Sequence, residues 1–589
     1  MDRNTLLRWA LIAVAVLVFM KWGLPHLTGK SDHETQPVPP EVYVNAPDFV
    51  PDRVDMSTDG RPYNPPEGEL CAIKGNRFEA TLSSRAAGIT HYKLLDPQYA
   101  SSEASDLSTT PDHERWRSLR TLFRGQGADD QVQYDRFNWK LEKSENPNGR
   151  ANSACTFTYA DNAVRIVKTV TTDGRPFELE IETKVTNLSD APKKHRFEIE
   201  QFAFRRNKET KGNLGRVSPF MTSLECANGK NVERKSRDDF KKGLISEPVD
   251  RFAAISNTYF AQALVVDTEA RCELLAEDWL APGQNRDDDD AATVYHANLV
   301  YAPKELGPGA TATYRNVAFG GPKERDALAH AAGGQKGLGD LINLGFFSVV
   351  AKVLVDILLF FHDKITVGNW GLAIIVMTLC LRILLFPLTW KSIKSSLGMS
   401  RLKPEIDALN AKFADDPQAK NMAMMELWKK HGVNPFGGCL PQIVQMPIWF
   451  AMYTTLQTAV EMYHTKFLWF NDLSAPDKLF VLPVLIGVLY VIQTKIMPQQ
   501  GMDPMQQKMM TYLMPAVFTV MMLFLPAALG VYMLTNSALG ITQQLAIKQF
   551  GPRTSGTAKG KDIEVREASK SSGASGGAGS NLRKGKARV

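Results

Sequence analysis

Apolar and polar residues alternate along much of the first half of the chain. The segment "PFELEIETKVTN" carries charged side chains on one face and apolar ones on the other, namely Phe177, Leu179, Ile181 and Val185. An alternating run over 164–171 precedes it, and Asp173-Gly174 between the two runs is typical of a hairpin turn. Because "HRFEIEQFAF", "YFAQALVV" and "TATYRNVAFG" repeat the pattern, we predict an all-β sandwich over residues 71–337.

The second half has a different pattern, with long runs that are almost entirely apolar. A helix needs about 20 apolar residues to cross a bilayer. Four stretches meet or nearly meet this requirement, and the last of them, 508–547, is too long for a single crossing. We therefore predict five transmembrane helices: 370–389, 440–462, 479–497, 508–525 and 527–547. Pro526 and Gly530 are predicted to form the tight turn between the last two.

The N-terminus supplies one more apolar run, from Trp9 to Leu24, behind Arg3 and Arg8. We interpret residues 1–24 as an uncleaved anchor because no small-residue cleavage site follows; a cleaved signal peptide is the alternative. The predicted fold is thus an α+β membrane protein with six transmembrane helices. Residues 25–70 are rich in Pro, Asp and Gly and are interpreted as a linker.

Residues 338–364, which join the two halves, are amphipathic rather than uniformly apolar. On a helical projection the side opposite the apolar residues carries a narrow polar face, with Ser348, Lys352, Asp356 and Asp363. This predicts a helix that lies in the outer membrane–water interface. A seventh transmembrane helix is the alternative, and it would break the topology that the charges favour.

Basic residues set the expected orientation. Eight Lys and Arg lie between 391 and 430, nine follow 550, and such segments stay on the cytoplasmic side. Residues 25–369 would then be periplasmic in a Gram-negative-type cell, with both termini in the cytoplasm. We predict a basic helical hairpin over 391–432, in which Asp416 caps the second helix, and a disordered basic tail over 551–589. For both segments, binding of anionic partners competes with a simple solvated, positively charged peptide.

The predicted sandwich carries no recognisable catalytic motif. Residues 71–337 contain no GxSxG, HExxH or Walker-type sequence, and the acidic run 287–290 lacks the ligand spacing of an EF-hand loop. No catalytic residue, cofactor or metal is therefore expected. Four cysteines can pair in three ways or remain reduced: Cys71, Cys155, Cys226 and Cys272.

One permanent cation, Arg382, lies inside the predicted span 370–389, seven residues from its cytoplasmic end. This is about 10 Å deep, where an Arg that faces lipid costs at least about 2.5–3.5 kcal/mol. We therefore expect it to face a hydrated groove, with Thr378 on the same face. Candidate facing groups come from other spans: Gln442, Gln445, Tyr532, Thr535 and Asn536. Pairing with lipid phosphates is the alternative.

Several stretches resemble the YidC family of membrane protein insertases. They are "VGNWG" before the span 370–389, Arg382 with the "FPLT" that follows it, "NPFGGCLPQIVQMPIWFAMY" and "DPMQQKMMTYLMP". They occur in the family's order, and the resemblance covers roughly 338–550. The single anchor, the large β domain and the interfacial helix are similar to the Gram-negative form of the family.

The resemblance implies a five-helix insertase core over 365–550 and a β-supersandwich similar to sugar mutarotases but without their activity. It implies a hydrophilic groove at Arg382, to which Thr378 and Tyr532 belong, and an aromatic residue, Trp449, that contacts the substrate helix. Some relatives have a second Tyr after Tyr532, where this chain has Met533. The implied partners are nascent membrane proteins, the ribosome through the basic tail, Sec translocon components and the lipid bilayer.

These features favour a non-enzymatic insertase and chaperone of the bacterial inner membrane, acting alone or with the Sec translocon. A nascent polar tail would enter a groove open to the cytoplasm and to lipid, and Arg382 would attract its carboxylates. Apolar burial would then drive insertion without ATP. The alternative is an anion-binding solute transporter, which predicts inverted repeats that we do not find. A membrane-anchored surface enzyme would leave five spans without a purpose.

Overall fold

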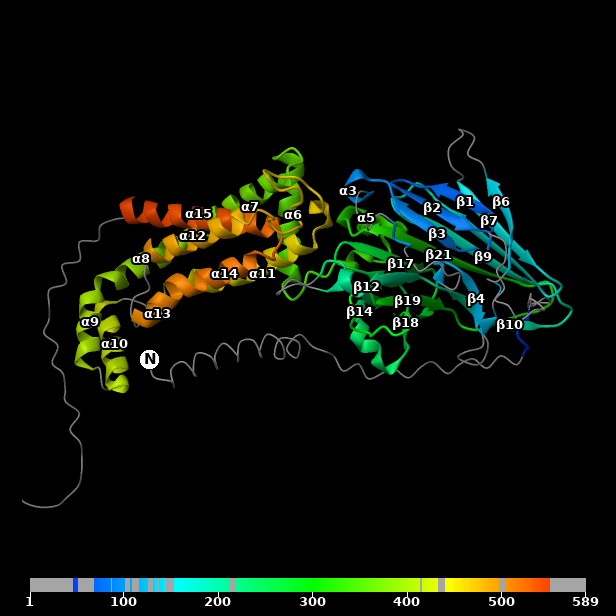
Figure 1. Cartoon of the computed structure of the whole chain (residues 1–589), viewed down its shortest axis with the longest axis horizontal. Coiled ribbons are helices and arrows are strands. Elements are labelled where there is room, and N and C mark those ends of the chain that lie inside the picture. Colours follow the sequence, from blue (N-terminus) through cyan, green and yellow to red (C-terminus); the bar gives the residue numbers. More distant parts are fainter. Residues whose placement is uncertain are drawn as a thin grey trace, which may run out of the picture.

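The computed structural model divides the chain into a β domain and a layer of long helices (Figure 1). The structure describes residues 46–50 and 68–550, apart from gaps at 86, 101–105, 109–115, 125–130, 133, 135–136, 145–152, 212–217, 414–415, 433–439 and 497–503. The predicted anchor 1–24, most of the linker 25–70 and the tail 551–589 lie outside the described residues. Phe49, within the predicted linker, is buried in the β-domain core.

Nine antiparallel strands form the larger sheet of the β domain. They are β6 (Lys140–Ser144), β7 (Ala154–Ala160), β8 (Val164–Thr171), β9 (Glu178–Asn187), β13 (Ser223–Asn228), β14 (Asn231–Lys235), β16 (Phe252–Ser256), β17 (Phe260–Val266) and β21 (Thr311–Pro322). Their spatial order is β14-β13-β16-β17-β21-β9-β8-β7-β6.

A second sheet has seven strands, with β12 paired to β19 beside the path β15-β18-β19-β11-β4-β5. Its strands are β4 (Thr121–Arg124), β5 (Gln131–Val132), β11 (Phe197–Ile199), β12 (Phe202–Arg206), β15 (Ile245–Val249), β18 (Ala270–Trp279) and β19 (Ala292–Val300). Two small sheets complete the domain, one of β1 (Leu70–Lys74), β2 (Phe78–Ser83) and β3 (Ile89–Leu94), the other of β10 (Lys193–His195) and β20 (Lys304–Leu306).

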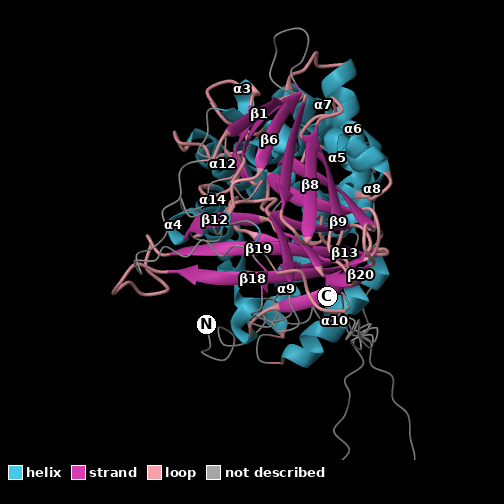
Figure 2. Ribbon diagram, turned by 90° about the vertical axis from the view of Figure 1, so that its right-hand side faces the viewer, coloured by secondary structure: helices cyan, strands magenta, loops and turns pink. Residues whose placement is uncertain are grey.

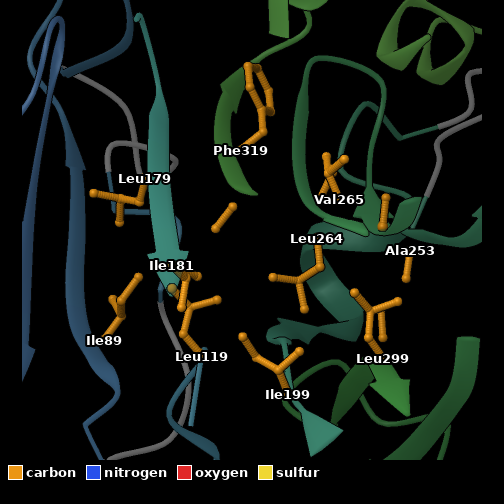
Figure 3. Close-up of a cluster of buried hydrophobic side chains, with 14 of the residues drawn as sticks. Ile89, Leu119, Leu179, Ile181, Ile199, Ala253, Leu264, Val265, Leu299 and Phe319 are labelled. Carbon is orange, nitrogen blue, oxygen red and sulfur yellow. The ribbon is translucent and has the colours of Figure 1, made fainter. Parts of the chain in front are cut away.

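The hydrophobic core fills the space between the two large sheets (Figure 3). Ile199 and Leu299 come from the seven-stranded sheet, and Ile181, Leu264 and Phe319 from the nine-stranded sheet; each is at most 2% exposed. In Figure 2, β8 and β9 run up the picture while β18 and β19 run across it, so the strands of the two sheets cross. The predicted all-β sandwich is present.

The predicted hairpin is confirmed, with one exception in its burial. β8 and β9 pair antiparallel, and Gly174 adopts φ +88° in the turn, a conformation that favours glycine. Glu178, expected on the solvent face, is only 2% exposed. The segment after α5 (Arg325–His330) covers it, and the N–H of Ala332 donates to its carboxylate at 3.1 Å. Burial raises the pKa of Glu178.

All four cysteines of the β domain are paired, in one of the three connectivities that the sequence allowed. Cys71–Cys155 joins β1 to β7, and Cys226–Cys272 joins β13 of the larger sheet to β18 of the other. The paired residues are 84 and 46 positions apart, so both bonds restrict the unfolded chain strongly. Short helices decorate the strands: α3 (Pro97–Ala100), α4 (Asn207–Thr210) and η4 (Arg237–Lys242).

The segment that leaves the sandwich is fixed to it by η5 (Ala331–Gly334) and η6 (Leu338–Leu341). Leu338 and Leu341 are fully buried in the β-domain core, and Arg251 donates to the carbonyl of Lys336 at 2.9 Å. The predicted amphipathic helix 338–364 is therefore shorter than expected. It begins at Ser348 and ends at Lys364, because its first residues belong to the β domain.

The helical layer contains α6 (Ser348–Lys364), α7 (Trp370–Leu384), α8 (Phe386–Arg401), α9 (Lys403–Lys412), α10 (Pro417–His431), α11 (Leu440–Thr458), η8 (Val460–Met462), α12 (Val481–Ile496), α13 (Pro504–Lys508), a π turn (Met509–Leu513), α14 (Met514–Met522) and α15 (Ala527–Phe550). Helices α7, α11, α12, α14 and α15 run side by side (Figure 1).

The predicted span 370–389 is broken. Pro387, in the first turn of α8, has no N–H for the carbonyl of Ile383, so α7 ends at Leu384. Taken singly, no helix in the described part of the chain has both the length and the apolar character of a membrane span; α7 and residues 386–395 have them only as a pair bent by 60°. The count of six transmembrane helices stays a prediction.

The last apolar region also departs from the predicted boundaries. The π turn ends two residues before Pro515, whose missing N–H a wider turn accommodates. Pro526 lies between α14 and α15 as predicted, but Gly530 lies inside α15 and is not part of the turn. A Cβ atom at Gly530 would lie 2.2 Å from Cδ2 of Leu482 in α12, so this glycine permits close packing of the two helices.

Helix α6 runs across the ends of the long helices (Figure 1). Its buried side includes Ala351 and Leu354, and it packs on α7 and α11. Next to its polar side lies an exposed apolar stripe, in which Val349, Val353 and Phe360 are 77%, 54% and 57% exposed. An exposed apolar stripe beside a polar one is typical of a helix in the bilayer interface.

The predicted basic hairpin 391–432 begins inside α8 and consists mainly of α9 and α10. Asp416 caps α10 as predicted, because its carboxylate accepts from the N–H groups of Gln418 and Ala419, both at 3.0 Å. The two helices share a small core, formed by Leu402, Ile406, Met424 and Leu427.

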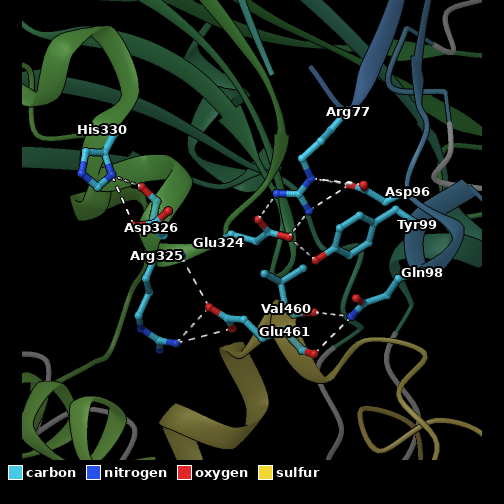
Figure 4. Close-up of polar contacts among 10 residues, drawn as sticks. All are labelled: Arg77, Asp96, Gln98, Tyr99, Glu324, Arg325, Asp326, His330, Val460 and Glu461. Atoms are coloured by element: carbon cyan, nitrogen blue, oxygen red, sulfur yellow. Dashed lines mark hydrogen bonds and ion pairs between the residues drawn. The ribbon is translucent and has the colours of Figure 1, made fainter. Parts of the chain in front are cut away.

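The β domain and the helical layer meet at the end of α11 (Figure 4). Arg325 of α5 forms an ion pair with Glu461 of η8 at 3.4 Å, and Gln98 of α3 donates to the carbonyl of Tyr463 at 2.6 Å. The ring of Tyr463 is buried in the β-domain core, among Tyr99, Tyr259 and Phe260.

Candidate functional site

Arg382 lies in the last turn of α7 and points toward α15. Its Nε donates to Oδ1 of Asn536 and its Nη2 to the backbone carbonyl of Asn536, both at 2.7 Å. The guanidinium is half-buried. Asn536 is neutral, and among the described residues Arg382 forms no ion pair. The positive charge is therefore held in place by neutral groups and is not cancelled.

Three further residues complete this polar cluster where α7, α11 and α15 meet. Gln445 of α11 donates to Oδ1 of Asn536 at 3.2 Å, and Gln543 of α15 donates to the carbonyl of Arg382 at 3.4 Å. A Cβ atom at Gly540 would lie 3.1 Å from Nη2 of Arg382, so the glycine leaves room for the guanidinium against α15. We call Arg382, Gln445, Asn536, Gly540 and Gln543 the arginine cluster.

The other residues predicted for the groove differ in their burial and in their hydrogen-bond partners. Tyr532 is 2% exposed and its hydroxyl is hydrogen-bonded to Gln445, at the edge of the arginine cluster. Thr378 is 1% exposed, and its hydroxyl donates to the carbonyl of Ile374 in its own helix at 2.6 Å. Thr535 is half-buried beside Asn536. Gln442 lies in the first turn of α11, and its side chain is outside the described part.

Trp449 lies one helical turn from Gln445 on α11 and faces α15. Its indole Nε1 donates to Sδ of Met533 at 3.1 Å, and its ring stacks on Tyr453 with centroids 6.0 Å apart. Met533 is thus the partner of the aromatic residue that is predicted to contact substrate. Together they form an apolar wall beside the arginine cluster.

Gly540 and Gln543 were not identified from the sequence. Their spacing from Asn536, four and seven residues, puts all three on one face of α15, so helical periodicity could have found them. Tyr490 of α12, hydrogen-bonded to Ser537, was missed as well, because a tyrosine in an apolar run has no distinguishing pattern.

Buried charges in the β domain form closed ion networks. Arg124 donates to Glu198 at 3.0 and 2.8 Å and also pairs with Glu273. Burial raises the pKa of Glu198. The exposed fractions of the Glu198 and Glu273 side chains are 0% and 6%, so this network presents no carboxylate to solvent.

The acidic run 287–290 faces two lysines, one inside α4 and one directly after it. Lys208 pairs with Asp290 at 3.3 Å, and Lys211 pairs with Asp289. Across the described ranges, no three His, Cys, Asp or Glu residues gather as potential metal ligands. Two carboxylates of this run are thus engaged by lysines.

Two family models match successive parts of the chain. The YidC periplasmic domain matches residues 70–357, and the 60Kd inner membrane protein matches residues 360–554. The membrane protein insertase YidC of Geotalea uraniireducens is 32% identical over 487 residues, which cover 82% of this chain and 87% of that protein. The chain belongs to the YidC family of membrane protein insertases.

Other YidC proteins align over different lengths. The protein of Geobacter sulfurreducens is 37% identical over 67% of this chain and 70% of its own length. That of Anaeromyxobacter sp. strain K is 43% identical over 249 residues, so the chain spans only 44% of that relative. An active YidC insertase crystal structure with the first transmembrane domain resolved covers 82% of this chain and 95% of its own, at 17% identity and a TM-score of 0.36.

A galactose mutarotase related enzyme from Lactobacillus acidophilus covers 43% of this chain and 97% of its own, at 10% identity and a TM-score of 0.31. The family models and the curated relatives give no support to the alternative of an anion-binding solute transporter. YidC membership also agrees with the multi-helix inner-membrane character predicted from the sequence.

Proposed function

We propose that this YidC protein inserts its clients, the membrane proteins it handles, by receiving their hydrophilic segment at the arginine cluster. Arg382 carries this proposal, because it is a half-buried cation with neutral partners. A guanidinium has five N–H donors, and the bonds to Asn536 use two of them. A hydrogen bond from a cation to a carboxylate in such surroundings contributes about 1.5–3 kcal/mol.

The apolar wall of Trp449 and Met533 would guide the client's hydrophobic helix past the cluster and toward lipid. Ile383 and Leu384, at the end of α7 beside Arg382, are 63% and 75% exposed and would contact acyl chains. Insertion would then proceed through apolar burial, at about 0.8 kcal/mol per CH₂ group. Such a process requires no catalytic residue and no cofactor.

We further propose the family's orientation. The β domain would lie in the periplasm, and the α9–α10 hairpin in the cytoplasm, where its lysines obey the positive-inside rule. The hairpin and the basic tail 551–589 would contact ribosomes or Sec translocon components. Eight basic residues between 391 and 430 and nine after 550 support this assignment.

The test is insertion by the purified full chain in liposomes, using a single-span client with an acidic N-terminal tail and protease protection as the readout. Arg382→Ala should lower the insertion rate about tenfold to hundredfold, by loss of the charged hydrogen bonds. Arg382→Lys should retain part of the activity. Asn536→Asp should also slow insertion of the acidic client. The new side chain has almost the same shape as asparagine, but its carboxylate would neutralise the guanidinium of Arg382.

Two controls make the result specific. Lys391→Ala removes an exposed cation from α8 and should leave insertion unchanged. A client whose tail acids are replaced by amides should be inserted equally by wild type and by all variants. If the acidic client were inserted equally well by wild type and Arg382→Ala, the role of the arginine cluster would be disproved.

A further inference from the structure

Three loops at the end of the helical layer that is nearer the β domain share one arrangement. In each, an exposed lysine lies within three residues of two exposed apolar residues that follow it. The sets are Lys364 with Ile365 and Val367, Lys466 with Leu468 and Trp469, and Lys478 with Leu479 and Phe480. The six apolar side chains are between 40% and 92% exposed. We call these nine residues the lysine–apolar rim.

The three loops lie against one another. The ring of Phe467 packs so closely on α7 that a Cβ atom at Gly371 would lie 2.2 Å from it, which places the second loop beside the start of α7, where the first loop ends. The indole Nε1 of Trp469 donates to Asp477 at 3.3 Å, which joins the second loop to the third. The rim is therefore one surface, although its first loop is about 100 residues from the other two in sequence.

The backbone of each loop is strained at an exposed apolar residue. Val367, Leu468 and Phe480 have φ values of +50°, +50° and +58°. Bulky side chains rarely adopt this conformation, because it crowds the Cβ atom against the backbone. These three side chains are 92%, 73% and 53% exposed, so they gain little from burial within the described protein and are open to an external apolar phase.

The lysines of the rim are available for anions. In the part of the chain that the structure describes, none of the three forms an ion pair. The adjacent carboxylates are engaged elsewhere: Asp477 accepts from the N–H groups of Leu479 and Leu482 at 3.0 and 2.8 Å, and Asp363 is 2.7 Å from His362. The rim thus combines uncancelled cations with exposed apolar groups.

We infer that the lysine–apolar rim binds anionic phospholipids, with the lysines on the headgroup phosphates and the six apolar side chains among the acyl chains. Charge complementarity selects this occupant, since a zwitterionic surface offers no net attraction for three cations. The exposed stripe of α6 would lie in the same interface. The inference goes beyond client insertion, because it concerns the binding of lipid at the end of the helical layer nearer the β domain.

The test is stabilisation of the purified full chain in a neutral detergent by dioctanoyl phosphatidylglycerol, followed as the rise of the unfolding midpoint with lipid concentration. The triple variant K364Q/K466Q/K478Q should bind this lipid on the order of a hundredfold more weakly, since each cation near an anionic surface contributes about fivefold in affinity. The matched control K74Q/K230Q/K242Q removes three exposed lysines from the β domain and should bind like wild type.

Dioctanoyl phosphatidylcholine and inorganic phosphate distinguish the lipid from its parts, and neither should reproduce the stabilisation. Equal binding of phosphatidylglycerol by wild type and the K364Q/K466Q/K478Q variant would overturn the proposal.

A second measurement tests the apolar half in lipid nanodiscs. A nitroxide at Leu479→Cys, in a C380S/C439S background, should collide with oxygen more than with a water-soluble nickel complex. The same nickel accessibility as at Leu244→Cys, an exposed β-domain site, would refute burial of the rim in lipid.

Discussion

Lys168 lies on β8 with its ammonium group inside the β-sandwich. The Nζ atom donates to the carbonyl of Ala87 at 2.9 Å and to that of Leu119. Burial lowers the pKa of Lys168 to about 7, because desolvation penalises the charged form. In the unfolded chain the pKa returns to about 10.4. Between these two values the unfolded chain binds one more proton than the folded chain, so the folded state gains stability as the pH rises.

We predict that Lys168→Met removes this pH dependence. The variant should be less stable overall, because the carbonyls of Ala87 and Leu119 lose their donor. The free energy of unfolding of wild type should rise relative to that of the variant between about pH 7 and pH 10, by roughly 1.4 kcal/mol per pH unit at most. Denaturant unfolding of the full chain at several pH values measures the slope. Lys93→Met, at an exposed position, should keep the wild-type slope; equal slopes for all three proteins would contradict the prediction.

Sequence patterns reach some of these residues and not others. Period-two alternation puts Lys168 on the same face as Val164 and Ile166, yet its acceptors come from other elements, at Ala87 and Leu119, which no local pattern connects to β8. Asn536 was identified because a polar residue in an apolar run is expensive and needs a partner. Its double hydrogen bond to Arg382 required the relative positions of α7 and α15, which only tertiary packing sets.

At the scale of elements, the boundaries of helices depend on contacts that composition does not reveal. Pro387 was visible in the sequence, but the 60° bend that follows α7 was not predicted. Proline is well tolerated in the first turn of a helix, and its presence does not specify the direction in which that helix continues. Gly530 was assigned to a turn for its backbone freedom. Its actual role is to omit a side chain where α12 and α15 approach each other.

Gly530→Ala provides a sign test of that role. In an unconstrained helix interior, replacing Gly with Ala stabilises by about 1 kcal/mol. Here the new Cβ atom would lie 2.2 Å from Leu482, so we predict destabilisation, because the two helices must separate or Leu482 must leave its rotamer. The thermal unfolding midpoint of the full chain in detergent should fall by a few degrees. Leu482→Ala in the same chain should partly restore it, and a midpoint above that of wild type for Gly530→Ala alone would show that the approach is not restrictive.

At the scale of the whole molecule, the β domain is attached to the layer that carries the arginine cluster at a second point besides the covalent connection. Figure 4 shows Arg325 and Gln98 of the β domain meeting η8, directly after α11. Helix α11 carries Gln445 and Trp449, so the contact fixes the end of a helix that lines the candidate site. Tyr463 reinforces it, since its ring is 5% exposed inside the β-domain core.

A charge reversal tests whether this contact sets the position of the β domain. Arg325 and Glu461 are 20% and 15% exposed, so removing one partner leaves a poorly solvated charge behind. Arg325→Glu would place two carboxylates together and should broaden the distance distribution between spin labels on the β domain and on α15, measured by pulsed electron resonance. The double reversal R325E/E461R restores opposite charges and should narrow the distribution again.

As a control, Arg315→Glu disrupts the exposed pair with Glu182 inside the β domain and should leave the distribution unchanged. A distribution that stays narrow in Arg325→Glu would mean that Tyr463 and Gln98 hold the two parts together without the ion pair.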